Sequence, residues 1–196
     1  MIGNLAHIAR FCLGNMAATA DHFMYFAFGS NLLKERLQLA NPSAIFHCTG
    51  RLKVIRFAAP PQNYTLNFGL WGEHIDNHWH GGVATIQQKE GGEVWGVVWR
   101  MSNDHLASLD KQEGVDMGMY FPLEVTVETD NGALLCRTYQ MNRFHACPPS
   151  PQYKQVVCLG AQQNGLPVQY MRRLEEVQTN NYSGPSILDK ISQVIK

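Results

Sequence analysis

The hydrophobic pattern becomes clear at Phe23, where an apolar and aromatic run extends to Phe28. Such a short, uninterrupted run is typical of a buried strand. Gly29-Ser30-Asn31 breaks the run, and residues 32–39 follow with apolar residues at helical spacing. We therefore predict a strand, a glycine turn, and a helix that Ser30 or Asn31 caps.

Further strands are predicted where Val, Ile, Thr and aromatic residues concentrate, at residues 44–52, 64–70, 81–87, 93–101, 119–128 and 134–141. Gly91-Gly92 predicts a hairpin turn between the third and fourth of these runs, and Asp130-Asn131-Gly132 one between the last two. Ser102 is expected to cap a helix over residues 103–112.

The last third of the chain has a helical pattern. Ser150-Pro151 combines a capping residue with proline at the first helical position, and Asn164-Gly165 marks the end of that helix. A second helix is predicted from Leu166-Pro167 toward Val177, and a short one ends the chain. Several strands with few parallel crossover units favour an α+β fold, a small, mostly antiparallel barrel or curved sheet flanked by helices.

We expect one domain over residues 23–196, preceded by a disordered extension at residues 1–22. That extension holds Arg10 as its only Lys or Arg and has no acid before Asp21. A mitochondrial presequence would be acid-poor but richer in arginine, so mitochondrial targeting stays the lesser alternative to a cytoplasmic location.

The composition narrows the function classes. Lys+Arg and Asp+Glu are 16 each, which argues against a nucleic-acid partner or a polybasic membrane patch. The sequence contains no run of 18 apolar residues, so it does not predict a transmembrane helix. The five cysteines are odd in number and lack a Cys-x-x-Cys pair, so they indicate neither a zinc site nor a disulfide framework.

Three local features could carry chemistry. The Gly29-Ser30-Asn31 turn would present backbone N–H groups to an anion, unless it is a plain capped turn. Glu113 ends the predicted helix before Gly114, where the helix dipole and burial would raise its pKa, unless it is exposed at a frayed end. Tyr153 lies in the first turn of the Pro151 helix, either facing a ligand or only packing.

Two histidine clusters suggest other chemistry. In the cluster of His74, His78 and His80, a metal site could be built from His78 and His80 with Glu73, although this stretch has the composition of a polar loop. His145 and Cys147 could be a nucleophile pair only if the fold brings them into catalytic geometry.

Several segments together resemble the γ-glutamylcyclotransferase family. The stretch from Tyr25 to Leu32 is similar to its Tyr-Gly-Ser-Asn loop, and the segment Pro-Pro-Ser-Pro-Gln-Tyr-Lys at residues 148–154 resembles the γ-glutamylcyclotransferase branch. Further similar segments lie in the same order at residues 41–44, 79–82, 93–99, 109–115, 118–120 and 163–167.

The resemblance implies a β-barrel with flanking helices, often a homodimer, that needs no cofactor and acts on a small γ-glutamyl amino acid. It implies Glu113 as catalytic acid and base. It implies a set of substrate-binding residues, namely Tyr25, Phe26, Ala27, Phe28, Gly29, Ser30, Asn31, Tyr120 and Tyr153.

Two departures from the family pattern stand out. Phe28 replaces the usual tyrosine, which removes one hydroxyl beside the turn, and residues 53–63 look like an inserted loop. The expected reaction forms 5-oxoproline and a free amino acid. Alternatives are an enzyme of the same fold directed at γ-glutamylamines or glutathione, a binding module without activity, and a metal enzyme that uses the three histidines.

Overall fold

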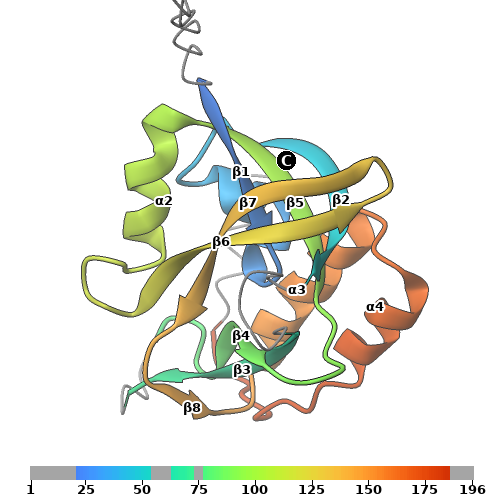
Figure 1. The fold of residues 1–196 in the computed structure, drawn as a ribbon. Helices are drawn as coiled ribbons and strands as arrows, with labels where there is room; N and C mark the ends of the chain where they lie inside the picture. The colour runs from blue at the N-terminus through green and yellow to red at the C-terminus, as the bar shows by residue number, and fades with distance from the viewer. Residues whose placement is uncertain (1–20, 54–62, 73–76, 186–196) are drawn as a thin grey trace, which may run out of the picture.

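The computed structural model describes residues 21–53, 63–72 and 77–185. Five strands close a barrel in the order β1, β5, β2, β6, β7 (Figure 1). Their bounds are His22–Ala27 for β1, Ile45–Lys53 for β2, Trp95–Ser102 for β5, Tyr120–Thr129 for β6 and Gly132–Met141 for β7. The predicted α+β barrel is therefore confirmed.

A second, three-stranded sheet lies beside one end of the barrel (Figure 1). Its order is β4 (Val83–Gln88), β3 (Tyr64–Trp71) and β8 (Phe144–Ala146). All pairs in this sheet are antiparallel. The barrel is antiparallel too, apart from β1 and β7, which run parallel with Tyr25 opposite Arg137. Strand β1 thus closes the barrel between two strands from much later in the chain.

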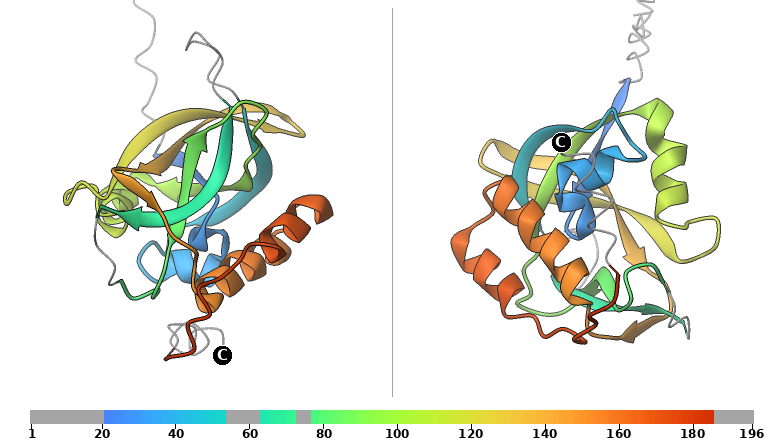
Figure 2. Two further views of the ribbon diagram at one scale, coloured as in Figure 1. Left: turned by 90° about the horizontal axis from the view of Figure 1, so that it is seen from below. Right: turned by 180° about the vertical axis from the view of Figure 1, so that it is seen from behind.

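The helices flank the barrel on two sides (Figure 2). Helix α2 (Leu106–Gln112) lies on one side, while α3 (Pro151–Gln163) and α4 (Val168–Glu175) pack together on the other. The caps predicted at Ser102 and Ser150 are confirmed. The Ser102 side chain accepts from the Asp104 N–H at 3.3 Å, and the Ser150 side chain from the Tyr153 N–H at 3.1 Å.

The hairpin predicted at Gly91-Gly92 is wrong. A turn does form, with the Gly92 N–H donating to the Lys89 carbonyl, but β4 pairs with β3 while β5 pairs with β1 and β2. The turn therefore carries the chain from one sheet to the other. A local turn pattern cannot show which strands pair, because pairing depends on distant parts of the chain.

The helix predicted over residues 32–39 is also corrected. A short 3-10 helix, η1 (Ser30–Leu32), precedes α1 (Lys34–Gln38), and neither Ser30 nor Asn31 caps with its side chain. The Asn31 amide instead turns toward Glu113. Two further elements were not predicted from the sequence, the three-residue strand β8 and the 3-10 helix η2 (Asn103–His105).

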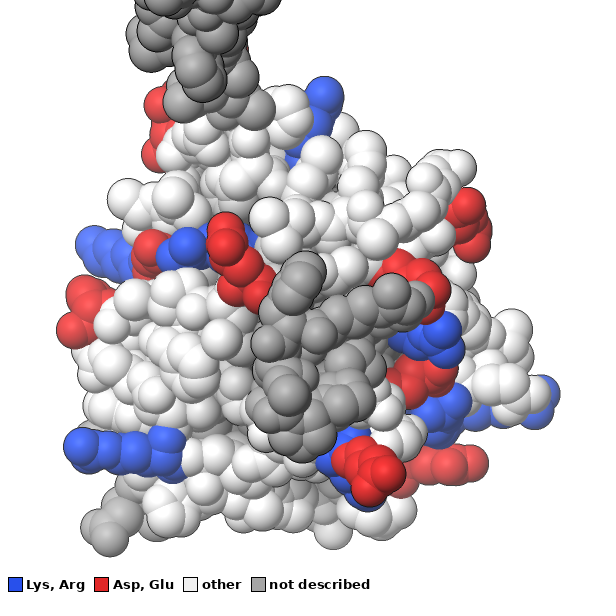
Figure 3. Space-filling model, viewed as in Figure 1, with Lys and Arg blue, Asp and Glu red and all other residues white. Residues whose placement is uncertain are grey.

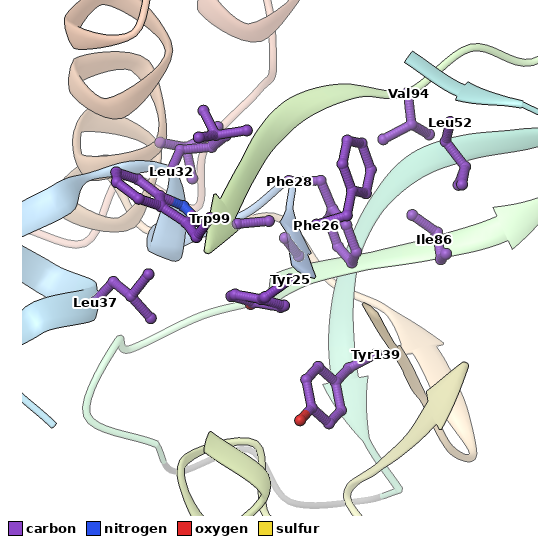
Figure 4. Close-up of a cluster of buried hydrophobic side chains, with 14 of the residues drawn as sticks. Tyr25, Phe26, Phe28, Leu32, Leu37, Leu52, Ile86, Val94, Trp99 and Tyr139 are labelled. Atoms are coloured by element: carbon purple, nitrogen blue, oxygen red, sulfur yellow. The ribbon is translucent and has the colours of Figure 1, made fainter. Parts of the chain in front are cut away.

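Strand β1 carries part of the hydrophobic core, as its unbroken apolar pattern predicts. Figure 4 shows Phe26 and Phe28 beside Val94, Leu52 and Ile86, all of them buried. Fully buried Trp99 lies near Leu32 and Leu37 in the same view. The Trp99 indole N–H donates to the Asn31 carbonyl at 3.1 Å, so the core holds the turn that follows β1.

Basic and acidic side chains are interspersed on the face drawn in Figure 3. Arg51 pairs with Glu93 at 3.3 Å and with Glu128 at 2.8 Å, and Arg173 reaches Glu93 at 3.1 Å. Among the described residues, no helix is long and apolar enough to cross a membrane. The predicted extension at 1–22, loop at 53–63 and final helix lie almost wholly outside the described residues.

Candidate active site

A cavity of about 490 Å³ is lined by residues of the barrel, the small sheet, the turn after β1, the end of α2 and the start of α3. It gathers eight of the ten predicted site residues: Tyr25, Phe28, Gly29, Ser30, Asn31, Glu113, Tyr120 and Tyr153. Phe26 and Ala27 do not line it, because both are fully buried in the core. The fold thus brings together residues that lie up to 128 positions apart.

Glu113 follows α2 directly, and Gly114 after it has a φ of 63°, a backbone conformation that glycine adopts easily. The half-buried carboxylate lines the cavity. Its Oε1 accepts from the Asn31 amide at 3.0 Å, and the Tyr25 hydroxyl approaches to 3.5 Å. Desolvation by burial raises the pKa of Glu113 from 4.5 to about 7, despite opposing effects of Arg36, Tyr25 and Asn31.

A carboxyl group with a pKa near neutrality can both accept and release a proton at cellular pH. The expected rise in the pKa is confirmed. Its largest cause is desolvation by burial, which the sequence pattern alone left open against exposure at a frayed helix end.

A chain of amide groups fixes the orientation of Asn31. Its Nδ2 donates to the Tyr25 hydroxyl and to Glu113, both at 3.0 Å, and its Oδ1 accepts from Gln112 Nε2 at 2.9 Å. Gln112 in turn accepts from Asn41 Nδ2 at 2.9 Å. Because every hydrogen-bonding atom of the Asn31 amide is engaged, the N–H that faces Glu113 is held in place.

Tyr120 and Tyr153 bind the same residue, Ala84 of β4. The Tyr120 hydroxyl donates to the Ala84 carbonyl at 2.8 Å, whereas the Tyr153 hydroxyl accepts from the Ala84 N–H at 2.9 Å. Burial is the largest cause that raises the pKa of both phenols, so both stay protonated near neutral pH. The Tyr153 proton remains available to another acceptor, while the Tyr120 proton is already engaged.

The turn at Gly29 lies tightly against the opposite wall. A Cβ at Gly29 would lie 2.8 Å from the Ala84 Cβ and 3.1 Å from the Tyr153 hydroxyl, so this position requires a residue without a side chain. Ser30 is close enough to Tyr153 to lower its pKa by hydrogen bonding. Phe28 is buried with 7% of its surface exposed and presents an apolar ring to the cavity.

Arg36 and Trp79 are among the residues of the cavity wall that were not predicted from the sequence. The Arg36 guanidinium lies over the Trp79 ring, 5.8 Å from its centroid, and the Trp79 ring meets the Tyr153 ring edge-on at 4.9 Å. Arg36 belongs to a short charged stretch, Lys34-Glu35-Arg36, which has the composition of a solvated surface. In the sequence, Trp79 was indicated only by the motif Trp79-His80-Gly81-Gly82, which resembles the family.

Asp110 fastens helix α2 to the barrel. Its carboxylate accepts two hydrogen bonds from Arg137 Nη2, at 2.7 and 2.9 Å, and one from the Tyr139 hydroxyl at 2.5 Å. The Tyr139 ring meets Tyr25 edge-on with centroids 5.9 Å apart. Asp110 therefore connects the helix that carries Glu113 to the wall that carries Tyr25.

The two described histidines of the predicted metal cluster have different surroundings. His78 lines the cavity, His80 stacks on Tyr182 with centroids 4.2 Å apart, and His74 is outside the described residues. Within the described ranges, no group of three or more His, Cys, Asp or Glu side chains is arranged to hold a metal ion. His145 lies in β8, and Cys147 just after it, where its thiol donates to the Pro148 carbonyl.

Known proteins resemble the chain over most of its length. It is 49% identical over 177 residues to a γ-glutamylcyclotransferase of Bos taurus, covering 90% of this chain and 89% of the relative. It is 47% identical over 177 residues to the γ-glutamylcyclotransferase of Homo sapiens, covering the same shares.

Structure and family models agree with these relatives. A solved γ-glutamyl cyclotransferase superposes with a TM-score of 0.79 at 46% identity, covering 89% of this chain and 98% of that one. The model of the AIG2-like family matches residues 93–174, a stretch that contains Glu113, Tyr120 and Tyr153. With this identity over nine-tenths of the chain, the protein belongs to the γ-glutamylcyclotransferase family.

Proposed function

We propose that the protein is an enzyme that converts γ-glutamyl amino acids to 5-oxoproline and a free amino acid. One observation carries the proposal. Glu113, whose pKa burial raises to about 7, lies on a cavity of about 490 Å³ whose wall it shares with Asn31, Tyr25 and Tyr153. The names of the curated relatives support the same reaction class.

The substrate brings its own nucleophile, the α-amino group, which closes a five-membered ring when it attacks the γ-carbonyl carbon. The enzyme therefore has to hold a folded conformer and to move protons. Well-oriented intramolecular attack can lower a barrier by about 7–11 kcal/mol. We infer that the Gly29-Ser30-Asn31 turn holds the glutamyl end of the substrate, because its backbone N–H groups suit a carboxylate.

Glu113 would act first as the base and then as the acid. It takes a proton from the α-ammonium group, and the freed amine attacks the γ-carbonyl carbon. The old C–N bond then breaks, and Glu113 returns its proton to the departing amine. The attacking nitrogen also gives up a second proton as it becomes the lactam N–H, and that proton goes to the same amine, so the amino acid leaves with an ammonium group. The hydrogen bond from Asn31 holds the carboxylate in position through these steps. These steps consist of an intramolecular amine attack, C–N bond cleavage and proton transfers, and the proposed mechanism assigns none of them to a metal or a nucleotide.

The two tyrosines would differ in their roles. Tyr153 keeps a hydroxyl proton that it can donate to the developing oxyanion or to the substrate carboxylate. Tyr120 already donates its hydroxyl proton to the Ala84 carbonyl, and its ring shapes the cavity wall. Phe28 offers no hydroxyl, but the backbone groups of the adjoining turn do not depend on one.

The test is release of 5-oxoproline from γ-glutamyl-alanine and from glutathione, with the wild-type protein and Glu113→Gln side by side. We expect release from the dipeptide and a loss of at least about 10³-fold in kcat for the variant, with binding of the dipeptide retained in calorimetry. An equal loss of binding and turnover by the folded variant would make Glu113 a positioning residue. Release from glutathione alone would favour the glutathione-directed alternative.

We further propose that the enzyme works as a homodimer in the cytoplasm. Exposed apolar side chains on the described surface are consistent with a subunit contact, among them Leu135 at 66% and Ile45 at 54% exposed. Sedimentation velocity would measure the assembly, and a sedimentation coefficient equal to that of a monomer across micromolar concentrations would contradict it.

A further inference from the structure

Arg36 is a cation on the cavity wall whose hydrogen-bonding capacity is not used within the described structure. Its Nε is buried and has no hydrogen-bond partner among residues 21–53, 63–72 and 77–185. Over the same residues, no carboxylate oxygen lies within 4.0 Å of its guanidinium. A buried N–H without a hydrogen-bond partner is costly. Because Arg36 lies on the cavity wall, we infer that a bound ligand accepts this hydrogen bond.

Trp79 holds the guanidinium in place. The Trp79 ring is buried with 6% of its surface exposed, and it is itself fixed edge-on against Tyr153. A cation stacked on such a ring is oriented without losing its in-plane N–H groups. These groups match the two oxygens of a carboxylate, which can accept two parallel hydrogen bonds from one arginine.

The proposed substrates carry two carboxylates, one at the glutamyl end and one on the amino acid that departs. The turn at Gly29-Ser30-Asn31 is assigned to the glutamyl end. Arg36 is within electrostatic reach of Glu113, which passes a proton to the departing amine. In an α-amino acid, the carboxylate is separated from that amine by one carbon, so a cation beside Glu113 is well placed to bind it.

We propose that Arg36 binds the carboxylate of the departing amino acid and thereby selects γ-glutamyl amino acids over γ-glutamylamines. The inference rests on the proposed function and adds a specificity-determining residue to it. A γ-glutamylamine has no such carboxylate and would leave the Arg36 N–H groups without a partner. Selection against it would therefore come from an unpaired buried donor.

The test compares γ-glutamyl-alanine with γ-glutamyl-alaninamide, which differ in the group that Arg36 is proposed to bind. The quantity of interest is the ratio of kcat/KM for the acid to kcat/KM for the amide. In Arg36→Met this ratio should fall by about 10- to 100-fold, the range expected for a charge-assisted hydrogen bond. Arg36→Lys keeps the charge but not the planar fork, and it should recover part of the ratio.

The ratio also separates specificity from an effect on Glu113. Removing Arg36 withdraws a positive charge that lowers the pKa of Glu113, so both substrates should show an acid limb shifted to higher pH. The ratio is therefore measured on the plateau above that limb. Lys34→Met removes a cation from the exposed surface of the same helix, and its ratio should stay at the wild-type value.

An equal loss for both substrates would place Arg36 at the glutamyl carboxylate or in a structural role, and would overturn the proposal. An unchanged ratio in Arg36→Met would overturn it as well. If the variant does not fold, Arg36→Gln with calorimetry of both ligands in the Glu113→Gln background gives the same comparison. Turnover of γ-glutamyl-alanine by the wild type tests the proposed function separately.

Discussion

Glu113 couples the free energy of unfolding to pH. Burial raises its pKa from 4.5 to about 7 in the folded protein, so between these values the folded state binds more protons than the unfolded state. The contribution of Glu113 to the free energy of unfolding is therefore fully present below pH 4.5 and is lost as pH rises toward 7. Glu113→Gln removes that loss, because a neutral amide has no charge to desolvate.

We expect Glu113→Gln to have a higher Tm than the wild type at pH 8, and the difference to vanish near pH 4.5. Thermal unfolding followed by circular dichroism across this range measures it. Glu124→Gln, an exposed carboxylate on β6, serves as the matched control and should show no such trend. A Tm difference that is the same at both pH values would mean that the carboxylate is not desolvated in the folded protein.

At the scale of single elements, α2 has two tasks at once. Asp110 of α2 binds Arg137 and Tyr139 of β7, and Glu113, three residues later, faces the cavity. Asp110→Asn should weaken the contacts with Arg137 and Tyr139 and cost about 1–3 kcal/mol of stability. It should also lower the pKa of Glu113, because the Asp110 charge raises it.

The acid limb of kcat/KM should accordingly move to lower pH in Asp110→Asn, while urea unfolding shows a lower midpoint. Asp116→Asn changes an exposed carboxylate in the loop after Glu113 and should do neither. A lower midpoint with an unmoved acid limb would show that Asp110 serves the fold alone.

Elements whose signals are local could be predicted from the sequence. The serine caps at Ser102 and Ser150 and the Asp130 to Gly132 hairpin depend on contacts within a few residues, and all three are confirmed. The division of strands between two sheets could not be predicted, since β4 and β5 choose partners far away in the chain. Arg36 was missed because a charged five-residue helix has the same composition whether it faces water or a cavity.

At the scale of the whole molecule, the site depends on how α3 packs against the turn after β1. Gly160 of α3 makes this approach possible, since a Cβ there would lie 2.4 Å from the Leu33 backbone nitrogen and 2.6 Å from the Leu32 Cβ. Gly160→Ala should cost about 1–3 kcal/mol through overpacking, more than the roughly 1 kcal/mol that alanine gains in a helix.

We also expect Gly160→Ala to lower kcat/KM, because the displaced turn carries Asn31. Urea unfolding and the 5-oxoproline assay measure the two effects. Gln162→Ala, at an exposed position of α3, is the matched control and should leave both near wild type. A stabilised Gly160→Ala variant would mean that α3 can shift without strain.

The parallel pairing of β1 with β7 has a consequence for synthesis of the chain. Strand β1 is made first, yet its two neighbours, β5 (Trp95–Ser102) and β7 (Gly132–Met141), leave the ribosome much later. Until then its aromatic run from Phe23 to Phe28 has no partner strand. Unpaired apolar strands promote aggregation of growing chains, so the nascent protein should depend on chaperones until β7 emerges and the barrel closes.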